Sequence, residues 1–125
     1  MVRSLPIALA IAAMLAGSAA AVTMEDFKVE QSQNLLNLCS ADESDPLYAE
    51  SKMFCLGYFA GAMHFHRALT STDKIKPVAC PQGTVTRVEA ANNFVTWARA
   101  NPQYMGEPAI DSAVRSAVAA WPCPK

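Results

Sequence analysis

The sequence lacks the short motifs that most often mark an enzyme. It contains no Gly-x-Ser-x-Gly elbow, which would present a serine nucleophile, and no glycine-rich loop of the kind that binds phosphate. Its two histidines, His64 and His66, point about 200° apart if they lie on one helix, so they cannot share a metal ion. The sequence therefore predicts no catalytic residues, no cofactor and no metal site.

A strong excess of charge of either sign is also missing. The chain has 10 Lys and Arg against 11 Asp and Glu, which argues against nucleic acid and anionic membranes as partners. After the first 21 residues no hydrophobic run is long enough to cross a bilayer. The longest later uncharged stretch, residues 53–66, has a length typical of a buried core helix.

Residues 1–21 have the composition of a secretory signal peptide. One cation, Arg3, precedes an apolar stretch, and a run of small residues then ends at Ala21. The apolar stretch is too short for a membrane-spanning helix, and the small residues suit cleavage near Ala20 or Ala21. We therefore expect export with removal of residues 1–21, and one domain formed by residues 22–125.

All the cysteines lie in the expected domain, and their number is even. Four cysteines after an export signal predict two disulfides, because exported proteins fold in oxidising compartments. No two of them have the Cys-x2–4-Cys spacing that a structural zinc site prefers. These residues are Cys39, Cys55, Cys80 and Cys123.

Proline and capping residues divide the domain into four expected helices. Ser32, Asp45 and Thr84 are suitable N-caps for the first three, and Pro108 opens the fourth. The ten residues before Ser32 have weak periodicity, and either an arm or a frayed first turn fits them. We expect an all-α fold, a small four-helix bundle, with helices at about residues 32–39, 46–69, 84–99 and 108–121.

The apolar residues of each expected helix indicate the side that packs in the core. The second helix is the longest and is almost uncharged, so we expect it to be central and covered on several sides. The expected inward residues are Cys55, Tyr58, Ala62, Phe65 and Leu69 in the second helix, Val85, Val88, Ala91, Val95 and Ala98 in the third, and Ile110, Ala113, Val114, Ala117, Val118 and Trp121 in the fourth.

The order of the helices favours one disulfide pairing. Short connections make successive helices roughly antiparallel, which places the start of the third helix near the end of the fourth. Cys80 and Cys123 lie at those two ends, which leaves Cys39 to pair with Cys55. The two other pairings stay open, because the sequence alone allows three connectivities.

Gly57 and Gly61 form a Gly-x-x-x-Gly pattern on the second expected helix. Two glycines four residues apart let another backbone approach closely. The pattern fits close packing inside the chain, and it also fits a contact between two copies. Both interpretations predict damage from a bulky replacement.

Four fragments, taken together, resemble the Rap/Tai immunity proteins. The resemblance extends over nearly all of the expected domain, from Asn34 to the terminal Pro-Cys. The fragments are specific as a set, although each is common alone. They are Cys55-Leu-Gly-Tyr-Phe-Ala-Gly61, Cys80-Pro-Gln-Gly83, Ala100-Asn-Pro-Gln103 and Trp121-Pro-Cys123.

This resemblance implies a helical, HdeA-like fold, a periplasmic location and frequent homodimers. Members of that family bind peptidoglycan amidase toxins delivered by type VI secretion and occlude their Cys-His active site, so the resemblance implies a binding protein and not an enzyme. It does not identify the contact surface. Because it is long, polar and tethered by Cys80, we expect the contact in the irregular connection after the second helix, at Thr72, Asp73, Lys74 and Lys76.

Two other functions fit the same fold. One is an acid-stress chaperone like HdeA, which loosens at low pH and exposes apolar surface. The four cysteines here, in place of two, argue against it, since additional cross-links resist loosening. The other is a periplasmic protein with an unrelated partner.

Overall fold

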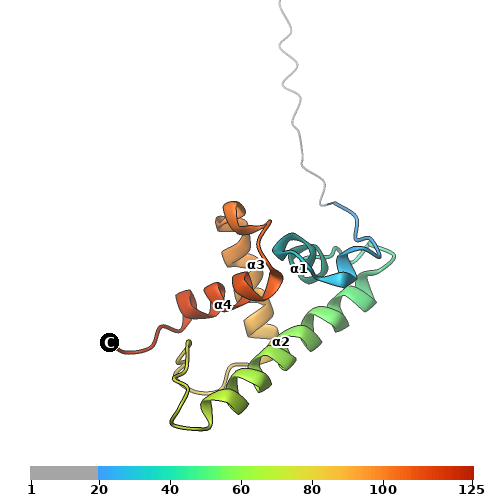
Figure 1. Cartoon of the computed structure of the whole chain (residues 1–125). Coiled ribbons are helices and arrows are strands. Elements are labelled where there is room, and N and C mark those ends of the chain that lie inside the picture. The colour runs from blue at the N-terminus through green and yellow to red at the C-terminus, as the bar shows by residue number, and fades with distance from the viewer. Residues whose placement is uncertain (1–19) are drawn as a thin grey trace, which may run out of the picture.

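The computed structural model describes residues 20–125, so the predicted signal peptide lies outside the described residues except for Ala20 and Ala21. The described part of the chain has four helices and no strand, and two disulfides, as predicted. No helix in this part is long and apolar enough to cross a membrane. In order, the elements are η1 (Asp26–Lys28), α1 (Ser32–Cys39), α2 (Tyr48–Thr70), α3 (Arg87–Ala100), η2 (Pro102–Tyr104) and α4 (Ala109–Ala120), shown in Figure 1.

The predicted helices are present, but their caps differ from those expected. Helix α1 is capped by Gln31, whose backbone N–H donates to Asn34 Oδ1 at 3.0 Å, while Ser32 is the first helical residue. Helix α3 is capped by Thr86 in place of Thr84, since the Glu89 N–H donates to Thr86 Oγ1 at 3.2 Å. The Thr86 N–H donates in return to Glu89 Oε2 at 2.7 Å, which completes a capping box.

Helix α2 begins two residues later than its sequence predicts. Asp45 accepts a hydrogen bond from the Leu47 N–H at 2.8 Å through its side chain. Its carbonyl accepts from the Tyr48 N–H at 2.9 Å. Asp45 and Pro46 therefore form a turn that leads into the helix, and Leu47 is the residue before its first turn.

The core lies where α1, α3 and the first half of α2 meet. Phe94 of α3 and Leu35 of α1 are fully buried, and the rings of Phe59 and Phe94 are 5.5 Å apart. The disulfide between Cys39 and Cys55 joins α1 to α2 beside them. Small side chains from α3 and α4 fill most of the remaining core, so these helices approach closely.

Two buried hydroxyl groups join α1 to α4. Ser32 Oγ lies 2.7 Å from Ser112 Oγ, and both side chains have no exposed surface. Ser32 Oγ also lies 3.0 Å from the Glu107 carbonyl oxygen, so the buried hydroxyls have partners.

Helix α2 is not central, and this prediction is wrong. The other three helices lie on one side of it, and its last turns extend beyond them in Figure 1. Phe65 is 65% exposed and Leu69 39% exposed, although both were expected in the core. Helix α2 contacts α1 and α3, and with 23 residues it is much longer than α1, with 8, and α4, with 12.

The predicted core side of α4 is wrong in part. Ala113 is buried and Trp121 packs against the core, as expected, but the branched residues Ile110, Val114 and Val118 are between 39% and 44% exposed. The buried residues are the small ones, Ala109, Ser112, Ala113 and Ser116, which let α4 pack closely on α1 and α3. In α3, Val88 is likewise exposed, and Ala90, Ala91, Phe94 and Ala98 form the core face.

Candidate partner-binding surface

The connection between α2 and α3 projects from the body of the molecule (Figure 1). Every residue from 71 to 78 is exposed. The four residues predicted to contact a partner, Thr72, Asp73, Lys74 and Lys76, all lie in this segment. Ile75 lies between the two lysines and is 47% exposed, so an apolar side chain stands among charged ones. We call residues 71–77 the projecting loop.

Both ends of the projecting loop are fixed. At its start, Thr70 Oγ1 donates to the His66 carbonyl at 2.9 Å and Ser71 Oγ to the Ala68 carbonyl at 2.8 Å, which satisfies the end of α2. At its end, the Val78 N–H donates to His66 Nε2 at 3.2 Å. His66 therefore contacts both ends of the loop.

The second disulfide anchors the chain directly after the loop. Cys80 is bonded to Cys123, as the sequence favoured, and the Cys80 N–H donates to the Trp121 carbonyl at 2.8 Å. These bonds tie the connection to the C-terminal segment that follows α4. The loop is thus long and exposed but held at a fixed place.

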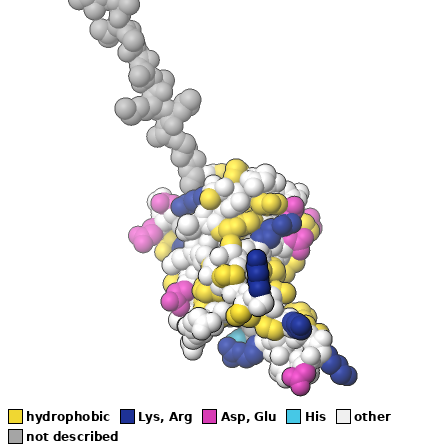
Figure 2. All heavy atoms as spheres, turned by 90° about the vertical axis from the view of Figure 1, so that its left-hand side faces the viewer, with side chains coloured by type: hydrophobic (Ala, Val, Ile, Leu, Met, Phe, Trp, Pro, Cys, Tyr) yellow, Lys and Arg dark blue, Asp and Glu magenta, His cyan; other side chains and the backbone are white. Residues whose placement is uncertain are grey.

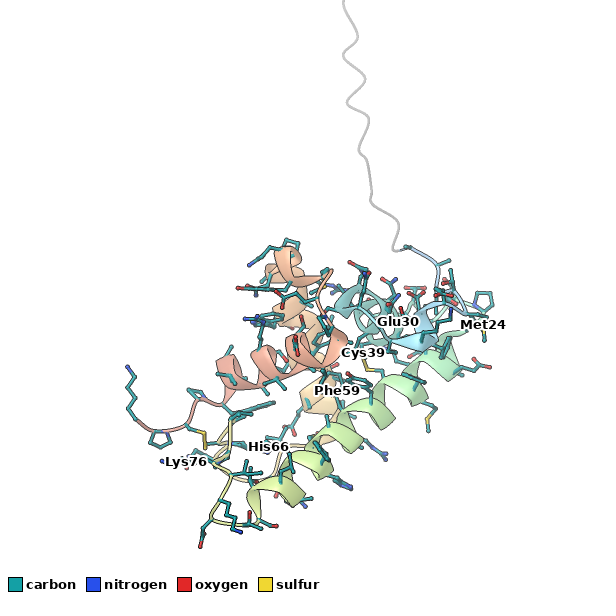
Figure 3. All side chains as sticks on the ribbon, viewed as in Figure 1. Met24, Glu30, Cys39, Phe59, His66 and Lys76 are labelled. Atoms are coloured by element: carbon teal, nitrogen blue, oxygen red, sulfur yellow. A yellow bond between two sulfur atoms is a disulfide. The ribbon has the colours of Figure 1, made fainter. Side chains whose placement is uncertain are left out.

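An apolar groove lies beside the projecting loop. It is formed by the second half of α2, residues 77–85 and α4, and its volume is about 420 Å³. Ile110 and Val114, the residues that turn away from the core, are on its α4 side, and Val78 is on the side of the connection. No Asp or Glu lines the groove, whereas His66 and Arg67 do. Figure 3 labels His66 at this position, and Figure 2 shows apolar side chains over this side of the molecule.

Charge is divided between the two ends of the molecule. Between residues 64 and 88, the cations Arg67, Lys74, Lys76 and Arg87 accompany a single acid, Asp73. Lys and Arg side chains accordingly gather near the loop end in Figure 2. Residues 22–50 are the reverse, since their one cation is Lys28 and their acids are Glu25, Asp26, Glu30, Asp42, Glu43, Asp45 and Glu50.

Asp26 organises the acidic end. Its side chain is only 4% exposed and accepts hydrogen bonds from Thr23, Asn34 and Asn37 at 2.9–3.1 Å. Burial acts to raise the pKa of Asp26, but these hydrogen bonds outweigh it, and the pKa lies below its ordinary value of 3.8. Asp26 therefore stays charged and holds η1 against α1.

The two histidines serve separate positions. His66 is half-buried and bonded to the connection, while His64 is exposed. Among residues 20–125, no three His, Cys, Asp or Glu side chains are grouped so that they could hold a metal ion. All four cysteines are in disulfides.

Gly57 and Gly61 are exposed on α2. In the described part of the chain, no atom outside their own helix and chain neighbours lies within 4 Å of where a Cβ would be added. Close packing inside the chain, one of the two interpretations of this pattern, is therefore not found here. A contact between two copies stays a prediction.

The groove was not predicted, although the sequence contains a signal for it. Ala109, Ser112, Ala113 and Ser116 are small and recur with the period of a helix, which is typical of a close helix contact. The small residues and the branched residues lie on different sides of α4, and only one side can face the core. The structure buries the side with the small residues, so Ile110 and Val114 line a surface groove.

The fold defines a small all-helical protein braced by two disulfides. The chain matches the family of Rap1a immunity proteins over residues 31–123, nearly all of the described structure, and it belongs to this family. Membership makes it an immunity protein, a class that acts by binding an effector protein. No curated protein and no solved structure matches the chain.

Proposed function

We propose that this protein is exported to the periplasm and neutralises a peptidoglycan amidase effector of type VI secretion by occluding its active-site cleft. The observation that carries the proposal is the projecting loop, exposed along its whole length and fixed at both ends. An inhibitor must fill a cleft without being processed, and a rigid loop on a cross-linked body meets that need. The resemblance to the Rap/Tai proteins supplies the class of target.

The fixed ends of the loop lower the cost of binding. A free loop would lose conformational freedom in the complex, at about 0.5–1.5 kcal/mol for each immobilised flexible side chain. Here the Val78 hydrogen bond and the Cys80–Cys123 bridge restrict the loop before any partner arrives. Ile75 offers an apolar tip for a cleft, and Lys74 and Lys76 favour a partner with acidic residues at its rim.

Export and cleavage after Ala21 fit the structure around Val22. The side chain of Val22 is buried, and its backbone nitrogen donates to Asp45 Oδ2 at 2.8 Å. Cleavage at this point would convert that nitrogen into an ammonium group, which makes a stronger bond to a carboxylate than a neutral amide does. The two disulfides also suit an oxidising compartment such as the periplasm.

The test combines binding and inhibition. Oxidised protein of residues 22–125 is mixed with each of a panel of type VI amidases, and both complex formation and peptidoglycan hydrolysis are measured. We expect one amidase to be inhibited stoichiometrically. If none is bound or inhibited, the proposed target is wrong, and retained helical structure with new dye-binding surface at about pH 2–3 would instead favour the chaperone function.

Matched variants locate the contact. We expect Ile75→Asp and the double change Lys74→Glu with Lys76→Glu each to weaken inhibition by at least about tenfold, equal to about 1.4 kcal/mol. Arg99→Glu is the control, because Arg99 is also exposed but lies near the end of α3, away from the projecting loop. Equal effects of loop and control variants would show that the projecting loop does not locate the contact.

A further inference from the structure

The apolar groove beside the projecting loop becomes basic toward the end of α2. Along this helix its lining begins at Phe59 and reaches His66 and Arg67 about two turns later (Figure 3). On the α4 side it is lined by Ile110 and Val114, both exposed. Among the described residues, no Asp or Glu lines it. An apolar groove with positive charge at one end suits a ligand that has an apolar chain and a negatively charged head group.

We propose that the groove binds a free fatty acid of medium chain length, with the chain between α2 and α4 and the carboxylate at Arg67. From Phe59 to Arg67 the helix rises about 12 Å, and an extended chain advances about 1.2 Å per bond, so about eleven carbons fit along it. Fatty acids of about ten to twelve carbons therefore match the length of the groove. This ligand is separate from the effector, so its binding does not depend on the proposed function.

The volume of the groove favours one chain over two. At about 420 Å³ it lies within the range of small-molecule sites, about 300–1,000 Å³. If each non-hydrogen atom takes about 30 Å³, the share of one water molecule in the liquid, the groove holds about 14 such atoms, as many as dodecanoate contains. A phospholipid has two chains, and the groove would leave one of them in water. The ligand is therefore a single-chain fatty acid.

The basic end of the groove offers two donors for the carboxylate. Arg67 lies in the last turn of α2, and a guanidinium group pairs with a carboxylate through two parallel hydrogen bonds. His66 Nε2 accepts from the Val78 N–H at 3.2 Å, so the neutral imidazole carries its proton on Nδ1, which is a second donor. The end of a helix repels an anion, but Thr70 Oγ1 and Ser71 Oγ already donate to carbonyls of the last turns, which reduces this repulsion.

Calorimetric titration of the oxidised protein with a series of fatty acids tests the proposal. The ligands are octanoate, decanoate, dodecanoate and tetradecanoate, each below the concentration at which it forms micelles. Each added methylene group should tighten binding by about two- to fourfold up to dodecanoate, because the groove removes it from water. Tetradecanoate should bind no more tightly than dodecanoate, since its last carbons extend beyond the groove. Decan-1-ol should bind at least about tenfold more weakly than decanoate, because it lacks the charge that Arg67 pairs with.

Matched variants place the ligand in the groove. Val114→Asp should weaken dodecanoate binding at least about tenfold, because it adds a second anion beside the chain. Val118→Asp is the control, since Val118 is on the same helix and is 40% exposed, against 39% for Val114, but does not line the groove. Arg67→Gln should weaken binding of decanoate but not of decan-1-ol. Arg99→Gln, at an exposed cation outside the groove, should change neither.

Each outcome decides the proposal. It would be overturned if no fatty acid binds, or if Val114→Asp and Val118→Asp weaken binding equally, which would show adsorption to exposed apolar surface. Tighter binding of phosphatidylglycerol vesicles than of dodecanoate, lost in Val114→Asp, would overturn it in favour of a membrane surface. If no fatty acid binds and Val114→Asp abolishes amidase inhibition, the groove belongs to the effector. Fatty-acid binding with the expected chain-length limit, in a protein that inhibits no amidase, would support this proposal and refute the proposed function alone.

Discussion

Removal of each disulfide in turn should show that the two bridges affect stability to a similar extent but that only the Cys80–Cys123 bridge affects binding. The bridge closes a segment of 43 residues and contributes nothing to the main core, since its cysteines lie outside the buried cluster. The Cys39–Cys55 bridge closes only 16 residues but lies inside that cluster. The variants are therefore Cys80→Ser with Cys123→Ser, and Cys39→Ala with Cys55→Ala.

The lengths of the closed segments set the expected magnitudes. A cross-link lowers the entropy of the unfolded chain, and the loop-closure relation gives about 4 kcal/mol for the longer segment and about 3 kcal/mol for the shorter. Loss of the buried sulfur atoms adds a packing cost to the second variant, because Cys39 and Cys55 are 5% and 2% exposed. We therefore expect the two variants to lose similar amounts of unfolding free energy. The first loses it through the entropy of the unfolded chain alone, and the second also through lost packing in the core.

Urea unfolding of the two variants, together with amidase inhibition, checks this reasoning. Loss of the Cys80–Cys123 bridge should weaken inhibition even under conditions in which the body stays folded, because the chain directly after the projecting loop then loses its covalent tie and keeps only the weaker Cys80 and Val78 hydrogen bonds and the packing of Val85. The Cys39–Cys55 variant should inhibit normally wherever it is folded. Unchanged inhibition without the Cys80–Cys123 bridge would refute the argument that the bridge positions the loop.

Three further changes probe the body of the protein. Phe94→Ala, at the centre of the core, should lower the unfolding free energy by about 3–5 kcal/mol in urea titration. Ser51→Ala should be neutral or slightly stabilising by the same measurement, because Ser51 Oγ is buried without a hydrogen-bond partner. Asp26 has a folded pKa below 3.8, so the unfolded state binds more protons near that pH, and its contribution is present above pH 4 and is lost as pH falls through the folded pKa. Asp26→Asn should therefore be less stable than the native protein near pH 7 and differ less from it at about pH 2, and an equal difference at both would contradict the assigned hydrogen bonds.

The positions of the helices could be predicted because local chemistry marks their ends. Pro46, Asn101-Pro102 and Pro108 mark the limits of α2, α3 and α4 to within about two residues of the structure. The cap of α3 was missed although the sequence marks it, because Glu89 lies three residues after Thr86 in the spacing of a capping box, and Thr84 has no such partner. Helix order favoured the disulfide pairing that the structure confirms, although the sequence alone left the two other pairings open.

The side of each helix that is buried was harder to predict. Periodicity in the sequence shows that apolar residues share one side of a helix, but it does not show what packs against that side. In α2 the uncharged stretch predicts burial, whereas the structure leaves Met53 and Phe65 exposed. A stripe that packs against another chain has the same composition as one that packs in the core. A single sequence cannot distinguish the two, since the covering element is not part of the pattern.

The packing of α4 explains why the groove lies beside the projecting loop. Ala109, Ser112, Ala113 and Ser116 pack α4 tightly against α1 and α3, and Ile110 and Val114 face the groove beside α2. The second half of α2 and the connection that Cys80 fixes to Cys123 line the rest of this groove. The close packing of small residues in the core therefore produces an apolar groove directly beside an anchored loop. A partner that engages the loop would meet Val78, Ile110 and Val114 at the same time, which gives one surface both an apolar and a basic part.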